Sequence, residues 1–223
     1  MPKRDTLESQ CDVIGWPISS LHAVKNGPKC WSLGEVASAR PEEVVACHIN
    51  RSGSQTCWCE GGSINLLIKA AALDIFTERN EFQDREDAVE RFLEAQLSNL
   101  RNHEAEILAR ISTISDHALA RNIDELLANV FVQNQYPRVN SKFMKLLATY
   151  VPQTYIAQIA HIFIKKPYDF RSGWPDLTVI DDGLRFVEVK TTDLLHDSQI
   201  RFGQELAAPL GLKCEVIRVC CVE

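Results

Sequence analysis

The sequence lacks a long apolar segment. No run of apolar residues approaches the roughly 18 that a membrane-spanning helix needs. No apolar core of the kind that a secretory signal contains follows the opening residues Met1-Pro-Lys-Arg-Asp5. We therefore expect neither a membrane protein nor a secreted one.

Cysteine pairs with the spacing of a zinc module are also lacking. The eight cysteines are irregularly spaced, and their one cluster, Cys47-His48 followed by Cys57 and Cys59, contains no C-x2-C pair. The neighbours Cys220 and Cys221 cannot both point to the same face of a strand. We expect reduced thiols that are mostly buried, with a structural zinc site as the alternative.

An excess of positive charge is missing as well. The chain carries 24 lysine and arginine residues against 30 aspartate and glutamate residues, so its formal net charge is −6. The charge is uneven, since residues 78–125 hold twelve acids against six arginines, whereas residues 138–218 hold eleven basic residues. We expect the first segment to form a solvated face and the second to line a track for the phosphate groups of a nucleic acid. The candidates for this track are Lys142, Lys145, Lys165, Lys166, Arg171 and Arg201.

Turn signals dominate residues 1–40. Because Gly15-Trp16-Pro17 and Asn26-Gly27-Pro28 interrupt every longer pattern, we expect an irregular arm with at most short elements. The next segment has Pro41 and two acids in its first turn and Gly53 beyond its end, which favours a helix. Its β-branched residues leave a strand as the alternative.

Helical periodicity dominates the middle of the chain. Ser63–Phe76 is apolar nearly all round, which predicts a buried helix. From about residue 84 to residue 166 the pattern stays helical, with Pro137 and Pro152 as breaks and no visible repeat. The helices predicted here are Arg85–Asn99, Glu104–Ile111, Asp116–Val130, Ser141–Tyr150 and Gln153–Ile164.

A tight β-hairpin is predicted for residues 172–190, and its turn decides its register. Asp181-Asp182-Gly183 supplies the turn. A three-residue loop, with its glycine in the left-handed region, pairs Ile180 with Leu184. A two-residue loop is the alternative, and it places the acid of the first strand on the wrong face. We prefer the three-residue loop because it gathers the charged residues of the hairpin into one cluster.

Two carboxylates and a lysine meet on this hairpin. The preferred register sets Asp176 directly opposite Glu188, with side-chain roots roughly 5 Å apart, and strand alternation puts Lys190 on the same face. Adjacent carboxylates repel each other unless a cation lies between them, and hard oxygen ligands suit Mg²⁺ or Mn²⁺. Lys190 could then reach a metal-bound water or a phosphate. From spacing alone, an ion-pair network on an exposed sheet face is an equal alternative.

The hairpin also carries a known signature. Pro175-Asp176 followed by Glu188-Val189-Lys190 resembles the PD-(D/E)xK motif of nucleases. The resemblance extends to the VRR-NUC branch of that superfamily through Gly173-Trp-Pro-Asp-Leu177, Gln199 on the following helix and a final strand Glu215-Val-Ile-Arg-Val219.

Upstream segments narrow the resemblance to the Fanconi-associated nuclease family. They are Trp58-Cys-Glu-Gly-Gly62, Arg138-Val-Asn-Ser-Lys-Phe143 and Asp169-Phe-Arg-Ser-Gly173. The resemblance implies an α/β fold with a restriction-endonuclease-like core, in which helices flank a small mixed sheet, and with a large all-helical insertion. Residues 41–223 would form a single nuclease domain, with the insertion at about 84–166 and the catalytic hairpin at 172–190.

The resemblance also implies a catalytic site. The implied catalytic residues are Asp176, Glu188, Lys190, Glu60 and Gln199, and the implied ligands of one or two Mg²⁺ or Mn²⁺ ions are Glu60, Asp176, Glu188 and the Val189 carbonyl group. Glu60 would join the metal site directly or through water. Lys190 would orient or deprotonate the attacking water, and Gln199 would support Lys190 or a phosphate.

The implied function is that of a metal-dependent, structure-specific DNA nuclease that acts in DNA repair on branched or 5′-flap DNA. Cellular members of the family carry long N-terminal DNA-binding and helical-repeat regions, for which 223 residues leave no room. The insertion obstructs the dimer of small stand-alone VRR-NUC proteins, so we expect a monomer. We expect it in the cytoplasm with the nucleoid, or in the nucleus of a eukaryote. The alternatives are a phage- or restriction-type nuclease or dimeric Holliday-junction resolvase, and a non-catalytic module that binds nucleic acid or protein.

Overall fold

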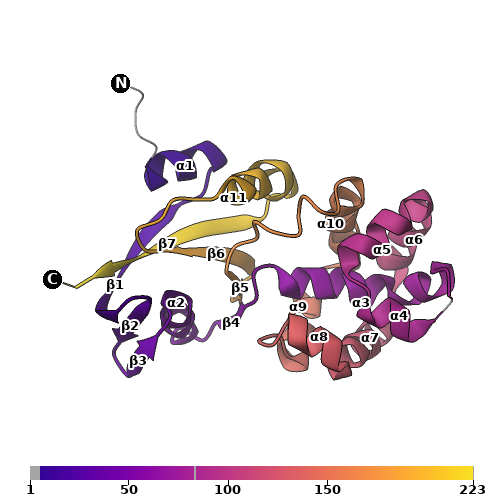
Figure 1. Cartoon of the computed structure of the whole chain (residues 1–223), viewed down its shortest axis with the longest axis horizontal. Helices are drawn as coiled ribbons and strands as arrows, with labels where there is room; N and C mark the ends of the chain where they lie inside the picture. Colours follow the sequence, from indigo (N-terminus) through magenta and orange to yellow (C-terminus); the bar gives the residue numbers. More distant parts are fainter. Residues whose placement is uncertain (1–5, 83, 223) are drawn as a thin grey trace. The chain divides into compact units, whose positions relative to one another are not determined.

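Two compact units make up the structure, a computed structural model that describes residues 6–82 and 84–222. Residues 1–61 and 173–223 form the sheet unit, and residues 62–172 form the helical unit. The predicted combination of a mixed sheet, flanking helices and a large all-helical segment is confirmed (Figure 1).

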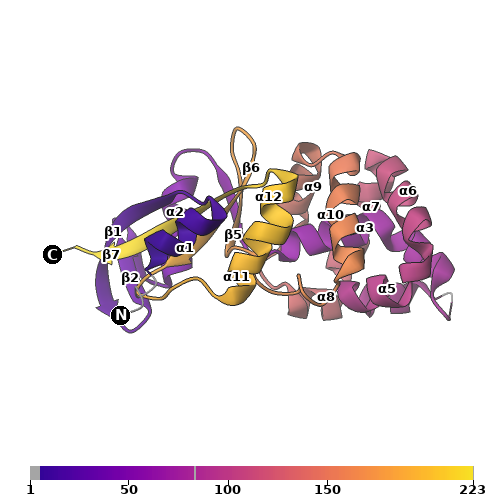
Figure 2. The ribbon, with the colours of Figure 1, turned by 90° about the horizontal axis from the view of Figure 1, so that it is seen from above.

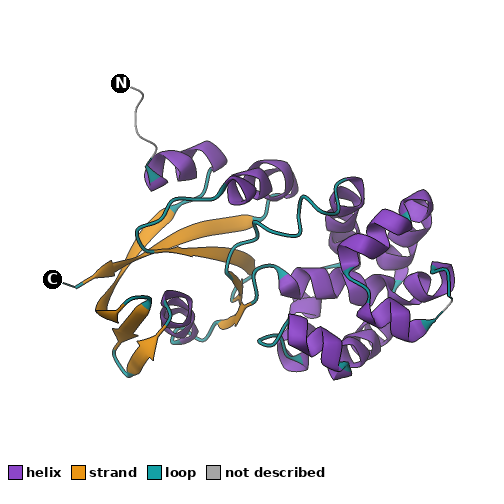
Figure 3. Ribbon diagram, in the orientation of Figure 1, coloured by secondary structure: helices purple, strands orange, loops and turns teal. Residues whose placement is uncertain are grey.

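Among the described residues, the sheet unit contains a seven-stranded sheet in the order β3-β2-β1-β7-β6-β5-β4 (Figure 3). Strand β7 runs parallel to both of its neighbours, β1 and β6, and the other neighbouring strands are antiparallel. The strands are β1 (Ile18–Gly27), β2 (Cys30–Leu33), β3 (Val36–Ala39), β4 (Gln55–Trp58), β5 (Leu177–Ile180), β6 (Leu184–Lys190) and β7 (Lys213–Cys221).

The prediction that residues 1–40 form an irregular arm is wrong. Residues 7–39 form helix α1 (Leu7–Ile14) and the first three strands, whereas residues 1–5 of the expected arm lie outside the described residues. The turn signals are real but connect regular elements, since Gly15 ends α1 with a left-handed φ of 70° and Gly27 ends β1 at the turn before β2. Strand β1 pairs with β7 from the far end of the chain, a partner that no local pattern indicates.

The hairpin of β5 and β6 has the predicted register, but the predicted left-handed conformation of Gly183 is wrong, since its φ is not positive. Ile180 pairs with Leu184, and continuing the ladder places Asp176 opposite Glu188. The alternative of an exposed ion-pair network is wrong, because the exposed fractions of Glu188 and Lys190 are only 2% and 3%.

Different helices cover the two faces of the sheet. The helices of this unit are α1, α2 (Pro41–Asn50), α11 (Asp197–Phe202), the π-helical turn η2 (Gly203–Ala207) and α12 (Ala208–Leu210). Helix α2 is the helix predicted after Pro41, and it packs on the face that carries Val187 and Val189. Helices α1, α11 and α12 lie across the other face, as Figure 2 shows from above. On that face Trp174 packs against Phe186 and Phe202, with ring centroids 5.6 and 4.5 Å apart.

The helical unit begins earlier than expected. It spans residues 62–172 rather than about 84–166, because α3 (Gly62–Arg79) belongs to it. Thirteen residues of α3 are buried, as predicted for a helix that is apolar all round, and α6, α7 and α10 pack around it. The other helices are α4 (Arg85–Glu90), α5 (Leu93–Asn99), α6 (Glu104–Thr113), α7 (Asp116–Ala128), α8 (Val130–Gln135), α9 (Ser141–Tyr150) and α10 (Gln153–Lys165), with a 3-10 turn η1 (Arg101–His103).

The helix predicted at residues 85–99 is interrupted between α4 and α5. The Nζ of Lys69 on α3 donates a hydrogen bond to the carbonyl oxygen of Arg91 at 2.7 Å. The Nε2 of Gln96 donates to the carbonyl oxygen of Ala88 at 2.8 Å. These side chains satisfy carbonyl groups that a continuous helix would bond internally, so tertiary contacts stabilise the break.

Two expectations about exposure can be compared with the structure. Within the described residues, no helix is both long and apolar enough to cross a membrane. All eight cysteines are free thiols, but only Cys11, Cys57 and Cys214 are buried and Cys221 is exposed, so the thiols are less buried than expected.

Candidate active site

Asp176 is held by the strands on both sides of it. Its backbone carbonyl accepts hydrogen bonds from the N–H groups of Cys59 at 3.0 Å and Glu60 at 3.2 Å, directly after β4. Its Oδ2 accepts a hydrogen bond of 2.8 Å from the N–H group of Val189 on β6. The pairing of β5 with β4 and β6 therefore fixes both the backbone and the side chain of this acid.

Glu188, Lys190 and Gln199 form a buried cluster on β6 and α11. Lys190 Nζ lies 2.9 Å from Glu188 Oε1 and donates a hydrogen bond of 3.1 Å to Gln199 Oε1. Gln199 Oε1 also accepts from the N–H group of His196 at 2.9 Å, which fixes the amide at the start of α11. A second carboxylate, Asp193, has Oδ2 at 3.4 Å from the ammonium group. The expected support of Lys190 by Gln199 is thus observed, and its part in catalysis stays a prediction.

Burial and mutual repulsion perturb the two carboxylates. Burial, followed by the charge of Glu188, raises the pKa of Asp176 from 3.8 to about 8. Burial also raises the pKa of Glu188, although Lys190 opposes the change. Burial lowers the pKa of Lys190, but the charge and hydrogen bond of Glu188, together with the charges of Asp193 and Asp176, outweigh burial, so this pKa lies above its ordinary value. The ammonium group therefore stays charged at neutral pH, and one cation is not enough to keep both acids ionised.

One oxygen of Glu188 has unsatisfied hydrogen-bonding capacity. Its Oε2 is buried and has no hydrogen-bond partner among the described residues. A buried carboxylate oxygen without a partner is unfavourable, and so are two adjacent acids with raised pKa values. A divalent cation would offset both, and carboxylate oxygens are the ligands that Mg²⁺ and Mn²⁺ prefer. The residues present therefore fit such an ion.

Glu42 is a further acid of this site that sequence reasoning missed. It lies in the first turn of α2, and its Oε2 is buried without a hydrogen-bond partner in the described part of the chain. Its charge contributes to the raised pKa of Asp176. The sequence explains an acid at this position by the helix dipole alone, and no local signal places it near the hairpin.

Glu60 is placed by an unusual backbone conformation. Its φ is 46° and that of the following Gly61 is 79°, both in the left-handed region. A Cβ added to Gly61 would lie 2.2 Å from the side chain of Trp174, so only glycine fits there. The Glu60 side chain is exposed, and no three His, Cys, Asp or Glu side chains of the described residues form a metal-binding group. The part of Glu60 as a metal ligand stays a prediction.

The basic candidates are spread over both units. Arg201 lies on α11 of the sheet unit, and the other five candidates belong to the helical unit. Lys145 Nζ pairs with Asp124 at 2.7 Å, and Arg171 lies 4.0 Å from Glu94. The remaining three, Lys142, Lys165 and Lys166, are exposed. The phosphate track therefore stays a prediction.

Solved structures provide a comparison for this arrangement. Neither the family models nor the curated proteins contain a match to the sequence. A crystal structure of paFAN1 bound to gapped DNA with a 2-nucleotide 5′ flap matches with a TM-score of 0.64 and 19% identity over 93% of this chain. The chain shares the fold of the matched part of paFAN1. A second paFAN1 structure, with a 1-nucleotide 5′ flap, matches with a TM-score of 0.63 and 18% identity over 93% of this chain. The chain covers 38% of the length of paFAN1 in both comparisons, and the resemblance to Fanconi-associated nucleases is confirmed for the fold.

Proposed function

We propose that this chain is a metal-dependent deoxyribonuclease that hydrolyses phosphodiester bonds. The observation that carries the proposal is the cluster of Asp176 and Glu188, two mutually repelling acids beside the buried ammonium group of Lys190. A structural ion pair with Lys190 needs only one acid, and a second acid with a raised pKa beside it adds an electrostatic cost to folding. Acids with strongly shifted pKa values cluster at active sites.

The metal ligands follow from the same cluster. Asp176, Glu188 and the Val189 carbonyl group would hold one or two Mg²⁺ or Mn²⁺ ions, with Glu60 and Glu42 as additional carboxylates. A bound ion lowers the pKa of a water molecule and offsets negative charge on the phosphate. The hydrogen bond from the Val189 N–H group holds Asp176 in the orientation this requires.

Lys190 has a distinct part in this proposal. Because its pKa lies above the ordinary value, its Nζ is protonated at neutral pH. A protonated amine can donate hydrogen bonds to the attacking water or to a phosphate oxygen, but it cannot accept a proton. The raised pKa therefore favours an orienting role over that of a base. Gln199 holds the ammonium group in place through its Oε1.

The fold similarity supports a substrate class. The paFAN1 structures contain DNA with 5′ flaps, and we infer that this chain acts on branched or 5′-flap DNA in DNA repair. Exposed basic side chains on α9 and at the end of α10 would contact phosphates. We infer a monomer that acts at the nucleoid or, in a eukaryote, in the nucleus.

A cleavage assay on labelled 5′-flap, four-way-junction and single-stranded DNA with Mn²⁺ tests the proposal. The wild type should cut the flap, and Asp176→Ala should not cut any substrate while keeping its circular dichroism spectrum. Asp182→Ala is the matched control, because it removes an exposed acid from the turn of the same hairpin and should keep full activity. Undiminished cutting by Asp176→Ala would refute the proposal. Junction cutting by a dimer, found by size measurement, would support the resolvase alternative instead.

A further inference from the structure

Arg218 is the strand neighbour of Lys190 on the face of the sheet that carries Glu188. In the parallel ladder of β6 and β7, Lys190 is the register partner of Arg218, so their backbones lie about 4.8 Å apart and both side chains point to the same face. On its other side, Arg218 is the register partner of Ser20 on β1. Lys190 is 3% exposed, the side chain of Arg218 is 29% exposed, and Ser20 is exposed. This row of residues therefore leads from the buried cluster to the solvent.

A single carboxylate contacts the Arg218 side chain in the described part of the chain. The Nη1 atom of Arg218 lies 2.6 Å from Oε1 of Glu8, in the first turn of α1. Its Nε and Nη2 atoms have no partner among the described residues. A guanidinium group carries five N–H donors. The contact with Glu8 therefore leaves most of the hydrogen-bonding capacity of Arg218 for another acceptor.

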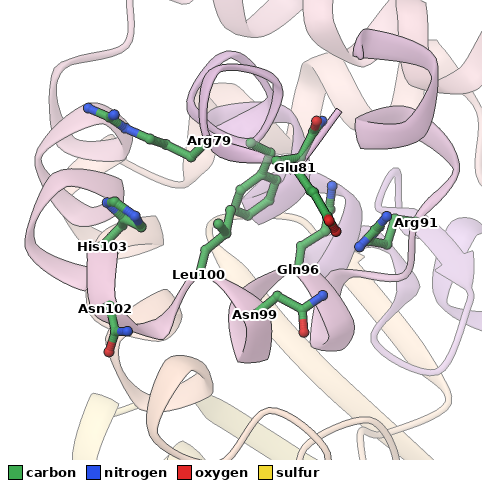
Figure 4. A pocket seen from close by; sticks show the side chains of 10 residues that line it. Arg79, Glu81, Arg91, Gln96, Asn99, Leu100, Asn102 and His103 are labelled. Atoms are coloured by element: carbon green, nitrogen blue, oxygen red, sulfur yellow. The ribbon is translucent and has the colours of Figure 1, made fainter. Parts of the chain in front are cut away.

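Other arginines of the chain are held by more than one nitrogen atom. Arg79 lines a polar cavity of the helical unit (Figure 4), and its Nε and Nη2 donate to both carboxylate oxygens of Glu106 at 2.7 to 3.3 Å. Arg185 on β6 contacts two different acids. Bonds from two nitrogen atoms fix a guanidinium group in one orientation. Arg218 makes no such second bond within the described residues, so its guanidinium group can turn toward a ligand.

The attachment of α1 does not explain the ion pair between Glu8 and Arg218. Three of the eight residues of α1 are buried, and the helix lies across this face of the sheet (Figure 2). The amide of Gln10 accepts a hydrogen bond of 2.7 Å from the N–H group of Leu195 and donates one of 3.4 Å to its carbonyl oxygen. The Glu8 side chain is 52% exposed, and exposed ion pairs add little stability. These other contacts therefore hold α1 in place.

The chemistry of Arg218 suits a phosphate group. Two cations on neighbouring strands repel each other unless anions offset their charge. Lys190 has the buried carboxylate of Glu188 at 2.9 Å, whereas Arg218 has only the exposed carboxylate of Glu8. A guanidinium group binds a phosphate through two parallel N–H bonds, an arrangement that a lysine cannot make. A phosphate would use the donors of Arg218 that Glu8 leaves without a partner.

We propose that Arg218 binds the DNA phosphate next to the one attacked at the metal site, and that Glu8 contacts the guanidinium group until DNA replaces it. This inference rests on the proposed nuclease function, which supplies the substrate. The strand order places Arg218 one strand beyond Lys190, on the side away from Asp176. The DNA backbone would thus pass from the acids over β7 toward the exposed part of β1.

Binding of labelled 5′-flap DNA to the full chain, measured by fluorescence anisotropy in EDTA at several salt concentrations, tests the proposal. Arg218→Gln should bind about tenfold more weakly, because it loses a charged hydrogen bond. The slope of log affinity against log salt concentration should also become shallower by about 0.7 to 0.9, the value for one phosphate contact. Lys213→Gln is the matched control, because it removes the same charge from an exposed position on the other face of β7, and it should keep the wild-type affinity and slope.

Variants of α1 test the exchange of Glu8 for a phosphate. Glu8→Gln should bind DNA about threefold more tightly, because it removes the carboxylate with which the phosphate competes. Asp12→Asn removes the same charge from an exposed position one turn later in α1 and should bind as the wild type does. The gain from Glu8→Gln should disappear when Arg218→Gln is also present. Because Glu8 is exposed, its variant tests the proposal even if Arg218→Gln fails to fold.

The possible outcomes separate this inference from the proposed function. The inference is overturned if the wild type does not bind DNA, if folded Arg218→Gln keeps the wild-type affinity and salt slope, or if Glu8→Gln binds no better than Asp12→Asn. A wild type that binds DNA but does not cut it with Mn²⁺ would refute the nuclease function. The anisotropy measurement would still decide whether Arg218 contacts a phosphate, because it requires no cleavage.

Discussion

Replacement of Asp176 by asparagine should make the metal-free protein more stable. Folding raises the pKa of this carboxyl group from 3.8 to about 8. At 1.36 kcal/mol for each pKa unit, the resulting penalty at pH 7 is at most about 4 kcal/mol. Because Asp176 and Glu188 titrate as a pair, we reduce this penalty by about half. Because asparagine keeps an oxygen for the Val189 N–H group, we expect the variant to gain about 2 kcal/mol in free energy of unfolding.

The pH dependence of stability has a defined sign. The folded-state pKa of Asp176 lies above the unfolded value, so the folded protein retains a proton that the unfolded chain has released. The free energy of unfolding of the wild type should therefore fall as pH rises from about 4 to about 8. Asp176→Asn should flatten this fall. Mn²⁺ should stabilise the wild type and have little effect on the variant.

Urea unfolding followed by tryptophan fluorescence, in the presence of EDTA, measures these effects. The signal reports on the sheet unit, because all four tryptophans lie in it: Trp16, Trp31, Trp58 and Trp174. Asp182→Asn in the hairpin turn is the control and should leave stability nearly unchanged. The reasoning is refuted if Asp176→Asn is less stable than the wild type at pH 7, or if both proteins show the same pH slope.

Three further changes probe the surroundings of the site. Lys190→Met should abolish cleavage and lower the free energy of unfolding by about 3 kcal/mol, because it leaves a buried carboxylate without its cation; unchanged urea unfolding would contradict this. Gly61→Ala would bring a Cβ to 2.2 Å from Trp174, whereas Gly53→Ala, at a φ of 91°, meets no described atom within 4 Å. In the same urea titration, we expect Gly61→Ala to lower the free energy of unfolding by more than about 3 kcal/mol and Gly53→Ala to lower it by about 1 kcal/mol. Equal losses would argue against the close contact with Trp174. Glu42→Gln should weaken Mn²⁺ binding several-fold in calorimetry, and unchanged affinity would place Glu42 outside the metal site.

Local chemistry was sufficient to predict the central hairpin. A three-residue turn pairs Ile180 with Leu184 as predicted, although Gly183 does not adopt the left-handed conformation that the prediction assumed, and this pairing brings the two acids together. Prolines and periodicity likewise located α9 and α10, whose observed starts match the predicted ones at Ser141 and Gln153. In each of these cases, the deciding interactions join residues that are close in the sequence.

Contacts between residues that are far apart in the sequence explain the features that were not predicted. Strand β1 is defined by its pairing with β7, about two hundred residues later, and turn signals lie at both of its ends. The break after α4 depends on Lys69 from a different helix. Glu42 joins the site through burial, which neither its neighbours nor its position in a first turn reveals. Spacing alone left undecided whether Glu188 and Lys190 are buried, and only the surrounding helices settle it.

The most direct measurement is the rate of 5′-flap cleavage as a function of Mn²⁺ concentration, for the wild type and for Asp176→Asn in parallel. The proposed metal site predicts that the wild-type rate rises with Mn²⁺ and saturates. It also predicts that the variant, folded and more stable without metal, does not cut at any Mn²⁺ concentration. Cleavage by the wild type in EDTA, or by the variant at the wild-type rate, would contradict the assignment of Asp176 and Glu188 as a metal-dependent catalytic pair.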